Sequence, residues 1–399
     1  MAGRRVARKG ATKRKGASRA PAIGESLISD IIAGIRTDVG DEYAQLLGSE
    51  LNLLKIRGVI STGVPGIDAA IGRGGFPLGR LSILHGGEGS GKTTIALQLC
   101  AMCQKSGGAA VYIDKEYKLD PDYARALGVN IDELGLSQPD TLEQVVETIK
   151  STAGTVKKHR IAGREVPTII IVDSLNASQA LETIKSETGK RQFPNEARIW
   201  SKELPEAVKL CSKESICLIF ISQIRRKINV LYGDDTTTAG GEAPKFHASV
   251  IAFLKQIKKG VKEGDNNKKV ASLVEVEFKK NQIAPPFGKA QFLLRFGKGV
   301  DYYDSLLRVA IEQGWVKHSG KKFTFEKTTF ATQGRSQAIR VIRGTKRLRV
   351  VLKKRTKGLW NGEEESTQDE SEPTVSDKPV SSKKTVRKSR AKRDVVSLD

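Results

Sequence analysis

A glycine-rich octapeptide is the feature that most restricts how this chain can fold. Residues 86–93 read Gly-Gly-Glu-Gly-Ser-Gly-Lys-Thr, which matches the pattern G-x-x-x-x-G-K-S/T. An apolar run at 81–85 precedes the octapeptide, and a helical stretch at 94–104 follows it. A strand, a glycine-rich loop and a helix in this order are typical of parallel α/β sheets, where the loop and the helix N-terminus surround an anion.

The octapeptide predicts a binding site for the phosphates of a nucleotide. Its glycines let backbone N–H groups wrap around phosphates, Lys92 would neutralise the distal phosphates, and Thr93 would offer its hydroxyl to Mg²⁺. We therefore expect ATP and Mg²⁺ as cofactors. The cofactor-binding residues expected in this segment are Gly86, Gly87, Glu88, Gly89, Ser90, Gly91, Lys92, Thr93 and Thr94.

Acidic residues stand at the ends of two other apolar runs. Asp173 ends the run 168–173, and ligands bind at the carboxyl edge of such buried parallel strands, so Thr93 and Asp173 are the expected ligands of Mg²⁺. Asp114 and Glu116 stand at the end of another such run. One of them could activate a water molecule, or both could belong to an ordinary polar strand end.

The spacing of the apolar runs predicts the arrangement of the sheet. In the first half of the chain the runs alternate with helical stretches, which indicates parallel β-α-β units, and in the second half they follow one another closely, which indicates a mixed edge. The predicted strands are 81–85, 109–114, 168–173, 216–222, 250–254, 274–278 and 291–296. Beyond them the pattern predicts a helix over 303–313 and a small hairpin about Gly320.

Several further motifs occur in one order along the chain. They lie at 60–68, 72–80, 112–128, 137–141, 220–225 and 245–249. Together with the octapeptide they resemble the RecA family of homologous-recombination ATPases, over about residues 55 to 330. The resemblance implies an α/β fold: a RecA-like P-loop ATPase core with a mostly parallel central sheet, a short N-terminal helix–strand docking segment and a small α+β C-terminal domain.

The resemblance also implies roles for residues in the matching motifs. Glu116 would orient the hydrolytic water, Lys92 would stabilise the phosphates, and Gln223 would sense the γ-phosphate and link it to the DNA loops. These three are the implied catalytic residues. Asp120 and Tyr123 would contact the adenine.

Two residues are implied to act between subunits. Lys280 would reach across the interface to the neighbour's phosphates, and Phe246 would couple adjoining subunits. Gln282 departs from the family pattern, because bacterial RecA has a second lysine there. Lys115 and Tyr117 also depart from it, because smaller or imidazole groups usually flank the glutamate.

Two loops are implied to contact DNA, at about 183–198 and 225–244. The second contains a run of small polar residues and glycines that suits contacts with phosphates without regard to sequence. The implied DNA-binding residues are Lys190, Arg191, Phe193, Arg198, Arg225, Lys227, Ile228, Thr237, Thr238, Gly240 and Gly241.

The function implied is that of an ATP-dependent DNA recombinase. It would form a helical filament of its own copies on single-stranded DNA, hold ATP at the subunit interface, capture double-stranded DNA and exchange strands, with DNA-stimulated ATP hydrolysis. Two alternatives stay open on the sequence: a RecA-fold ring helicase or motor, and a weakly hydrolysing RecA paralogue that coats DNA or modulates filaments.

Charge is distributed unevenly along the 399 residues, whose formal net charge is +23. Residues 1–20 carry eight basic side chains and no acidic one, 328–362 carry ten basic ones, 363–377 carry seven acidic ones, and 378–393 return eight basic ones. The predicted organisation is a disordered basic arm (1–20), an oligomerisation segment (21–58), the core (59–300), a C-terminal domain with a basic extension (301–360) and a disordered charged tail (361–399). The pattern predicts a helix over 25–35 and, over 41–60, a second short helix followed by an extended segment that ends at Ile60.

Composition excludes several classes of protein. No run of about 18 apolar residues occurs, so we expect no membrane-spanning helix. The basic N-terminus lacks the apolar stretch of a secretory signal, so we expect a cytoplasmic protein, and the resemblance to the RecA family implies that it is associated with the nucleoid. The four cysteines predict buried thiols rather than disulfides or a zinc site.

Overall fold

The computed structural model describes residues 23–40, 44, 56–163, 166–175, 193–223, 225–226, 236–237, 241–262 and 268–361. Of the predicted segments, the arm at 1–20, the tail after Asn361, and most of both DNA loops lie outside these described residues. So does the short helix that we expected after residue 40, except for Ala44. The chain divides into one unit that contains every described residue and a second unit, Glu363–Asp399.

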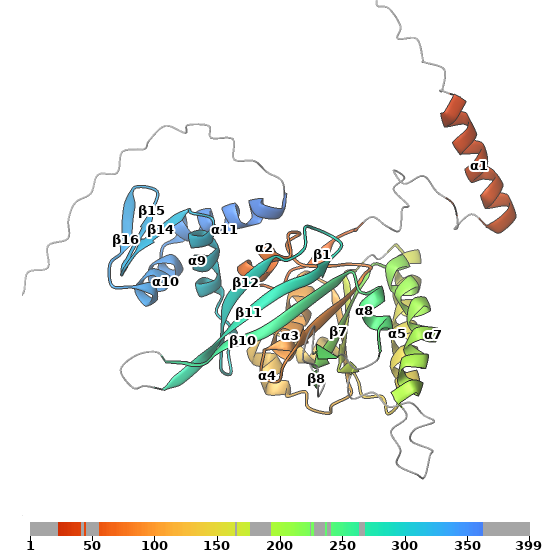
Figure 1. Ribbon diagram of the computed structural model, residues 1–399, viewed down its shortest axis with the longest axis horizontal. Coiled ribbons are helices and arrows are strands. Elements are labelled where there is room, and N and C mark those ends of the chain that lie inside the picture. The colour runs from red at the N-terminus through yellow and green to blue at the C-terminus, as the bar shows by residue number, and fades with distance from the viewer. Residues whose placement is uncertain are drawn as a thin grey trace, which may run out of the picture. The chain divides into compact units, whose positions relative to one another are not determined.

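The described residues form a nine-stranded sheet with the order β13-β12-β11-β10-β3-β7-β6-β4-β5. Figure 1 shows its strands β12, β11 and β10 side by side. Neighbouring strands from β10 through β3 to β5 pair in parallel, whereas β10 to β13 pair antiparallel. This arrangement confirms the predicted parallel half and mixed edge. The strands are β3 (Leu81–Gly86), β4 (Ala109–Asp114), β5 (Leu134–Ser137), β6 (Thr168–Asp173), β7 (Ile216–Gln223), β10 (Val250–Lys262), β11 (Lys269–Asn281), β12 (Lys289–Arg295) and β13 (Gly299–Val300).

Apolar cores lie on both faces of the parallel strands. In β6, Ile169 and Ile171 belong to one core, with α3, and Ile170 and Val172 belong to the other, with α5 and α7. A continuous apolar run is therefore what a strand buried on both faces requires. The helices of this half are α3 (Lys92–Lys105), α4 (Pro121–Ala126), α5 (Leu142–Ile161), α7 (Phe193–Lys213), α8 (Ala243–His247) and the 3-10 helix η2 (Ile131–Glu133).

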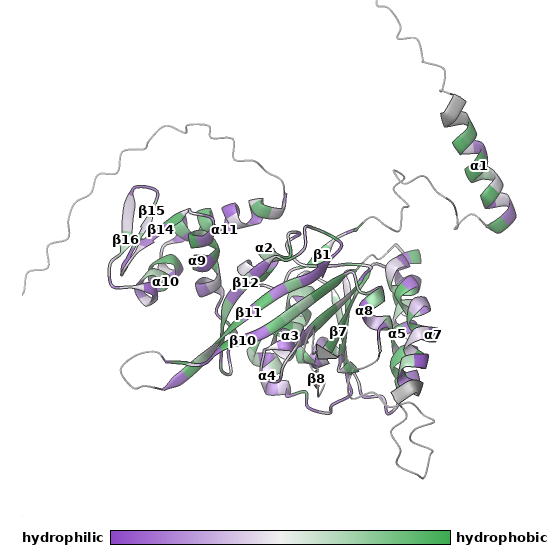
Figure 2. Cartoon of the chain, viewed as in Figure 1, coloured by the Kyte–Doolittle hydropathy of each residue, from purple (hydrophilic) through white to green (hydrophobic). Residues whose placement is uncertain are grey.

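The helices α5 and α7 each have both hydrophobic and hydrophilic surfaces, because each helix faces the sheet on one side only (Figure 2). The start of α5 is fixed by a capping box, in which Thr141 accepts from the backbone N–H of Gln144 and the Gln144 side chain accepts from that of Thr141. The last turn of α5 carries basic residues, which suits the negative end of the helix dipole.

The strands β10 and β11 are longer than predicted, since each has 13 residues. The extension of β10 is rich in lysine and largely exposed, so it lacks the apolar run on which the prediction depended. Two short pairs, β8 (Arg225–Arg226) with β9 (Thr236–Thr237) and β1 (Val59–Ile60) with β2 (Phe76–Pro77), are antiparallel.

The helix expected over 25–35 is confirmed as α1 (Ile23–Val39). Its side chains Leu27, Ile28, Ile31 and Ile35 are exposed and follow helical spacing. The chain then continues, after residues that are not described, into β1 and α2 (Pro65–Ala70). Among the described residues, no helix combines the length and apolar character needed to cross a bilayer.

Residues 302–361 build a separate apolar core from helices and a small antiparallel sheet. The predicted helix and the hairpin about Gly320 are confirmed. The third strand and two helices were not predicted, because we interpreted the charged segment after residue 328 as an extension. The elements are α9 (Tyr302–Glu312), β14 (Val316–Ser319), β15 (Lys322–Phe325), β16 (Thr328–Ala331), α10 (Arg335–Gly344) and α11 (Lys346–Asn361).

The predicted thiol state of the cysteines is confirmed. Cys100, Cys103, Cys211 and Cys217 are all free and buried. Burial raises the pKa of the Cys103 and Cys211 thiols to about 12, so both are protonated at neutral pH. No cluster of metal-ligating side chains occurs within the residues that the structure describes.

Candidate active site at the carboxyl edge of the parallel strands

Four neighbouring parallel strands end at the same edge of the sheet. β3 leads into the glycine-rich loop, β4 ends at Asp114, β6 ends at Asp173, and β7 ends at Gln223. Their register aligns Gly86 with Gln223 and Asp114 with Asp173. Residues that are up to 137 positions apart in the sequence therefore meet at one edge, which is the usual ligand-binding edge of such sheets.

The loop 86–91 is shaped to hold an anion. Gly91 is the N-cap of α3 and has a φ of 88°, in the left-handed region that favours glycine. A Cβ atom built on Gly87 or Gly89 would meet nothing within 4 Å, so the loop is open on that side. The first turn of α3 has no side-chain cap, which leaves its N–H groups available for phosphate oxygens.

Lys92 lies against this loop. Its Nζ donates to the carbonyl oxygens of Gly86, at 3.0 Å, and Gly87, at 2.8 Å. Burial lowers the pKa of Lys92, while the nearby carboxylates of Asp173 and Glu116 act in the opposite direction. The ammonium group is thus held beside the loop, where it can contact phosphates.

Thr93 and Asp173 lie together, as expected. Thr93 Oγ1 donates to Asp173 Oδ2 at 3.1 Å, and the Tyr112 hydroxyl donates to the same oxygen at 2.6 Å. Burial raises the pKa of Asp173, and these two hydrogen bonds oppose that rise. A hydroxyl and a carboxylate are the hard oxygen ligands that Mg²⁺ prefers, so this pair fits the ion.

Glu116 receives hydrogen bonds from two other strand ends. Ser174 Oγ donates to Glu116 Oε1 at 2.6 Å, and Gln223 Nε2 donates to the same oxygen at 2.8 Å. Lys118 Nζ lies 3.2 Å from the other carboxylate oxygen. The structure therefore brings together Glu116 and Gln223, which come from separate motifs.

Ser174 was not among the predicted site residues. The signal that could have identified it is its position, because it follows directly on Asp173 at a strand end that is already assigned to the site. The side chain of Ser174 is fully buried, which fixes its hydroxyl in place.

Asp114 has a different environment from Glu116. Its buried carboxylate accepts from the backbone N–H groups of Glu116 and Leu119, each at 3.1 Å. Asp114 therefore stabilises the turn that carries Glu116. The sequence left open which of these two acids could activate a water molecule. Glu116 is the better candidate, because its carboxylate contacts Ser174 and Gln223 at two neighbouring strand ends.

The expected adenine contacts lie at α4. The Tyr123 hydroxyl is 2.8 Å from Thr94 Oγ1, at the first turn of α3. Asp120 is the N-cap of α4 and accepts from the N–H groups of Asp122 and Tyr123. The structure thus places Tyr123 beside the phosphate-loop helix, and it gives Asp120 a capping contact.

Lys280 lies away from the glycine-rich loop of its own chain. It is aligned with Ile251 in β10, near the end that pairs with Ser82, whereas the loop begins at the opposite end of β3. Lys280 Nζ donates to the carbonyl oxygens of Lys245 and Phe246, both at 3.0 Å. The Phe246 side chain beside it is 78% exposed.

The expected DNA-binding residues are described only in part. Phe193, Arg225 and Thr237 lie in described backbone, and Arg198 and Gly241 are described fully. The predicted end of the first loop is wrong, because α7 begins at Phe193 and residues 193–198 are therefore helical. A Cβ on Gly241 would lie 3.0 Å from Ala197, so the end of the second loop meets α7. Those outside the described residues are Lys190, Arg191, Lys227, Ile228, Thr238 and Gly240.

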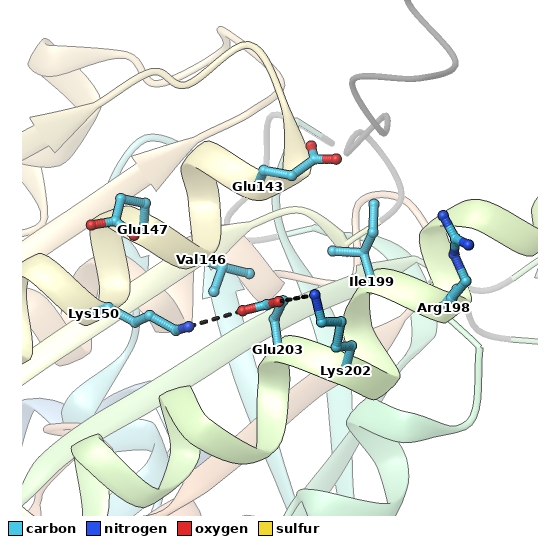
Figure 3. Close-up of a pocket in the computed structure, with 8 residues that line it drawn as sticks. All are labelled: Glu143, Val146, Glu147, Lys150, Arg198, Ile199, Lys202 and Glu203. Carbon is cyan, nitrogen blue, oxygen red and sulfur yellow. Dashed lines mark hydrogen bonds and ion pairs between the residues drawn. The ribbon is translucent and has the colours of Figure 1, made fainter.

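Arg198 borders a cavity of about 520 Å³ between α5 and α7. Glu143 and Glu147 line it from α5, and Arg198 and Lys202 line it from α7 (Figure 3). An ion pair of 2.9 Å between Lys150 and Glu203 joins the two helices. Because both signs of charge line this cavity, it has no clear preference for an anionic ligand.

Comparisons with known proteins identify the family. The RecA N-terminal domain matches residues 26–301. The chain belongs to the RecA family. It is 38% identical to Protein RecA of Borreliella afzelii over 280 residues, which cover 70% of this chain and 74% of the relative. It is 37% identical to Protein RecA of Lactococcus lactis subsp. cremoris over 79% of this chain and 77% of the relative.

A third relative covers more of the chain. Protein RecA of Clostridioides difficile is 35% identical over 340 residues, which cover 85% of this chain and 93% of the relative. The predicted family and fold class are therefore confirmed. Membership of the RecA family makes this protein an ATP-hydrolysing recombinase of DNA recombination and repair, which binds ATP and DNA and forms filaments. The two alternatives from the sequence, a ring helicase or motor and a weakly hydrolysing RecA paralogue, are therefore not favoured.

Proposed function

We propose that this RecA family member assembles on single-stranded DNA, captures duplex DNA, and catalyses homologous pairing and strand exchange, with DNA-stimulated ATP hydrolysis. The observation that carries the proposal is the 2.8 Å hydrogen bond from Gln223 to Glu116. It connects the candidate water-orienting carboxylate to the strand that leads into the second DNA loop. DNA bound at that loop can therefore change the environment of Glu116.

In this proposal, the chain's residues divide the work of hydrolysis. The loop N–H groups and Lys92 bind the phosphates, and Thr93 and Asp173 hold Mg²⁺. When bound, ATP supplies the phosphoryl group to be transferred, and Mg²⁺ supplies charge that stabilises it. Glu116 orients a water molecule and accepts its proton, while Gln223 can exchange its hydrogen bond to Glu116 for another acceptor.

DNA binding is proposed to depend on backbone contacts from the two loops. Arg198, Arg225 and the other basic residues of these loops would bind phosphates, while the small polar residues and glycines allow close approach. Such contacts ignore base sequence, so specificity in homologous pairing would come from base pairing between the strands.

Filament assembly is proposed to use α1 and the segment after it. The exposed apolar stripe of α1 needs a partner surface, and β5 is the last strand in the described sheet order, so one of its edges is available for pairing. Lys280, which lies away from its own glycine-rich loop, is proposed to reach the nucleotide of the neighbouring copy. ATP would then lie at the subunit interface of a cytoplasmic, nucleoid-associated filament.

ATP hydrolysis by the wild type and a Glu116→Gln variant tests the mechanism. Single-stranded DNA should raise the kcat of the wild type, and the variant should lose at least about 100-fold of kcat while still binding nucleotide. The role of Glu116 would be contradicted if the variant hydrolysed ATP as fast as the wild type and if DNA raised the turnover of neither protein.

Electron microscopy tests the assembly. With circular single-stranded DNA and a non-hydrolysable ATP analogue, we expect continuous striated filaments. Isolated six-membered rings would refute the proposed assembly. In a parallel preparation with ATP, removal of Mg²⁺ with a chelator should abolish hydrolysis.

A further inference from the structure

Lys115, the residue before Glu116, makes contacts toward β5, on the opposite side of β4 from Ser174 and Gln223. Lys115 Nζ donates to the carbonyl oxygens of Pro139, at 2.5 Å, and Asp140, at 2.7 Å. These carbonyls belong to the turn between β5 and α5. The side chain of Lys115 is buried, with 7% of the residue exposed.

The sheet order shows why these contacts brace the loop. β4, which carries Lys115 and Glu116 at its end, lies between β5 and β6. Lys115 contacts the segment after β5, while Glu116 contacts Ser174 after β6 and Gln223 at the end of β7. Two consecutive side chains thus hold the loop from opposite sides.

Other hydrogen bonds connect the same loop and turn. The Tyr117 hydroxyl donates to Asp140 Oδ1 at 3.2 Å, and Gln138 Nε2 donates to Asp114 Oδ2 at 3.4 Å. Tyr117 has a φ of 54°, a conformation that a tyrosine rarely adopts without constraint from its surroundings. The backbone N–H of Lys115 also donates to the carbonyl of Asp173 at 2.7 Å.

We propose that Lys115 is a positioning residue for ATP hydrolysis, because it fastens the loop that carries Glu116 to the 138–140 turn. The inference rests on the proposed role of Glu116 and deepens it. Without the two hydrogen bonds from Lys115, the loop would retain only the longer hydrogen bonds of Tyr117 and Gln138 on the β5 side, at 3.2 Å and 3.4 Å. The carboxylate would then sample a wider range of positions relative to the water that it orients.

A purely structural role for Lys115 makes a different prediction. Loss of a buried cation that satisfies two carbonyl groups could simply destabilise the fold. In that case nucleotide binding and turnover would fall together, in proportion to the fraction of folded protein. A positioning role lowers kcat and leaves nucleotide affinity unchanged, because Lys115 contacts neither the glycine-rich loop nor Lys92.

The experiment measures DNA-stimulated ATP hydrolysis, and separately the Kd of a fluorescent ATP analogue, on full-length protein. Lys115→Met keeps the length of the side chain and removes its donors. We expect it to lower kcat about 10- to 100-fold and to change Kd less than about twofold. Lys115→Arg, which keeps a cationic donor, should recover most of the lost kcat. Lys157→Met, which changes an exposed lysine of α5, is the matched control and should behave as the wild type.

A double variant tests whether Lys115 acts through Glu116. If it does, Lys115→Met should cause no further loss of kcat in a Glu116→Gln background. The inference would be overturned if the two substitutions lowered kcat multiplicatively in the double variant. It would also be overturned if Lys115→Met left kcat unchanged, or if it weakened nucleotide binding in parallel with kcat. A fully active Glu116→Gln variant would refute the role of Glu116 itself, and the inference with it.

Tyr117→Phe gives a second test that does not depend on folding of Lys115→Met. It removes one hydroxyl from a side chain that is 57% exposed, so it leaves the core intact. Because it removes one of the hydrogen bonds to the 138–140 turn, we expect a smaller decrease of kcat, about two- to tenfold. An unchanged kcat in this folded variant would also count against the inference.

Discussion

Asp68 is a single residue whose protonation is coupled to folding. Its carboxylate is buried and accepts from Ser61 Oγ at 2.5 Å, Thr62 N–H at 2.8 Å and Thr62 Oγ1 at 2.7 Å. Burial raises the pKa of Asp68 to about 7, although these hydrogen bonds oppose the rise. Among the described residues, Tyr302 is an ionisable group whose pKa Asp68 influences. Burial above all raises the pKa of Tyr302 to about 12, so Tyr302 does not titrate near neutrality.

The raised pKa predicts that Asp68 makes the fold less stable as pH rises. The folded state binds a proton that the unfolded state releases, so between about pH 4 and pH 7 the free energy of unfolding should fall with increasing pH. It should level off above pH 7, where both states are ionised. Urea unfolding of the wild type and Asp68→Asn at several pH values checks this, because the variant should lose that part of the slope. Identical slopes in both proteins would show that Asp68 does not titrate in this range.

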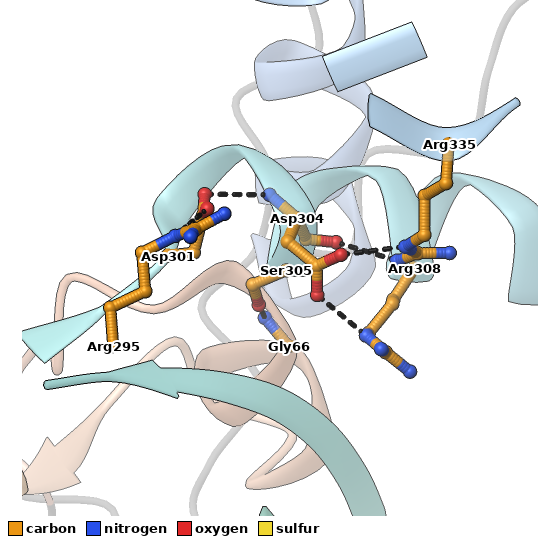
Figure 4. Close-up of polar contacts among 7 residues, drawn as sticks. All are labelled: Gly66, Arg295, Asp301, Asp304, Ser305, Arg308 and Arg335. Carbon is orange, nitrogen blue, oxygen red and sulfur yellow. Dashed lines mark hydrogen bonds and ion pairs between the residues drawn. The ribbon is translucent and has the colours of Figure 1, made fainter. Parts of the chain in front are cut away.

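At the scale of elements, α9 is held by a set of polar contacts with its neighbours (Figure 4). Arg308 Nε and Arg335 Nε donate to the fully buried carboxylate of Asp304, at 2.7 Å and 2.6 Å, which ties α9 to α10. The backbone N–H of Gly66 donates to Ser305 Oγ at 2.9 Å, which ties α9 to α2. Arg308 and Arg335 share the single buried negative charge of Asp304, so loss of that charge would leave both arginines without their carboxylate partner.

Replacement of Asp304 by asparagine should destabilise the protein strongly. Breaking a fully buried ion pair from one side costs about 3–5 kcal/mol, and the loss here should lie toward the lower end, because the side chains of Arg308 and Arg335 are 25% and 34% exposed and water partly compensates them. Urea unfolding measures the loss, and Asp122→Asn is the control, since Asp122 pairs with Arg125 on the surface. The control should change stability little. Equal effects of the two substitutions would contradict the importance of burial at Asp304.

Elements also show how far the sequence could predict this fold. The strands β3, β4, β6 and β7 were predicted because burial on both faces gives continuous apolar runs. The helices α10 and α11 were not, because their buried side chains, Ala338, Ile342 and Leu352 among them, are separated by basic residues. The same limit applies to the site. Glu116 and Asp173 could be predicted because they belong to sequence motifs, whereas the contacts of Ser174 and Lys115 could not, because they depend on which strands lie side by side.

At the scale of the whole molecule, the excess positive charge is concentrated in segments outside the ATPase core. Residues 363–377 carry seven acidic side chains, and 378–393 carry eight basic ones, so these two segments have opposite charge. Basic segments bind DNA by releasing counterions, and acidic segments oppose this. Neither belongs to the elements that form the nucleotide site.

Two partial deletions should therefore change duplex binding in opposite directions. Deletion of 378–393 should weaken binding to double-stranded DNA and flatten its dependence on salt, because each lost phosphate contact lowers the logarithmic salt slope by about 0.9. Deletion of 363–377 should strengthen binding. The Kd for nucleotide should stay the same in both, since the glycine-rich loop is untouched. Duplex affinity measured across a salt titration checks this, and equal affinities for both deletions and the full chain would show that these charges do not contact DNA.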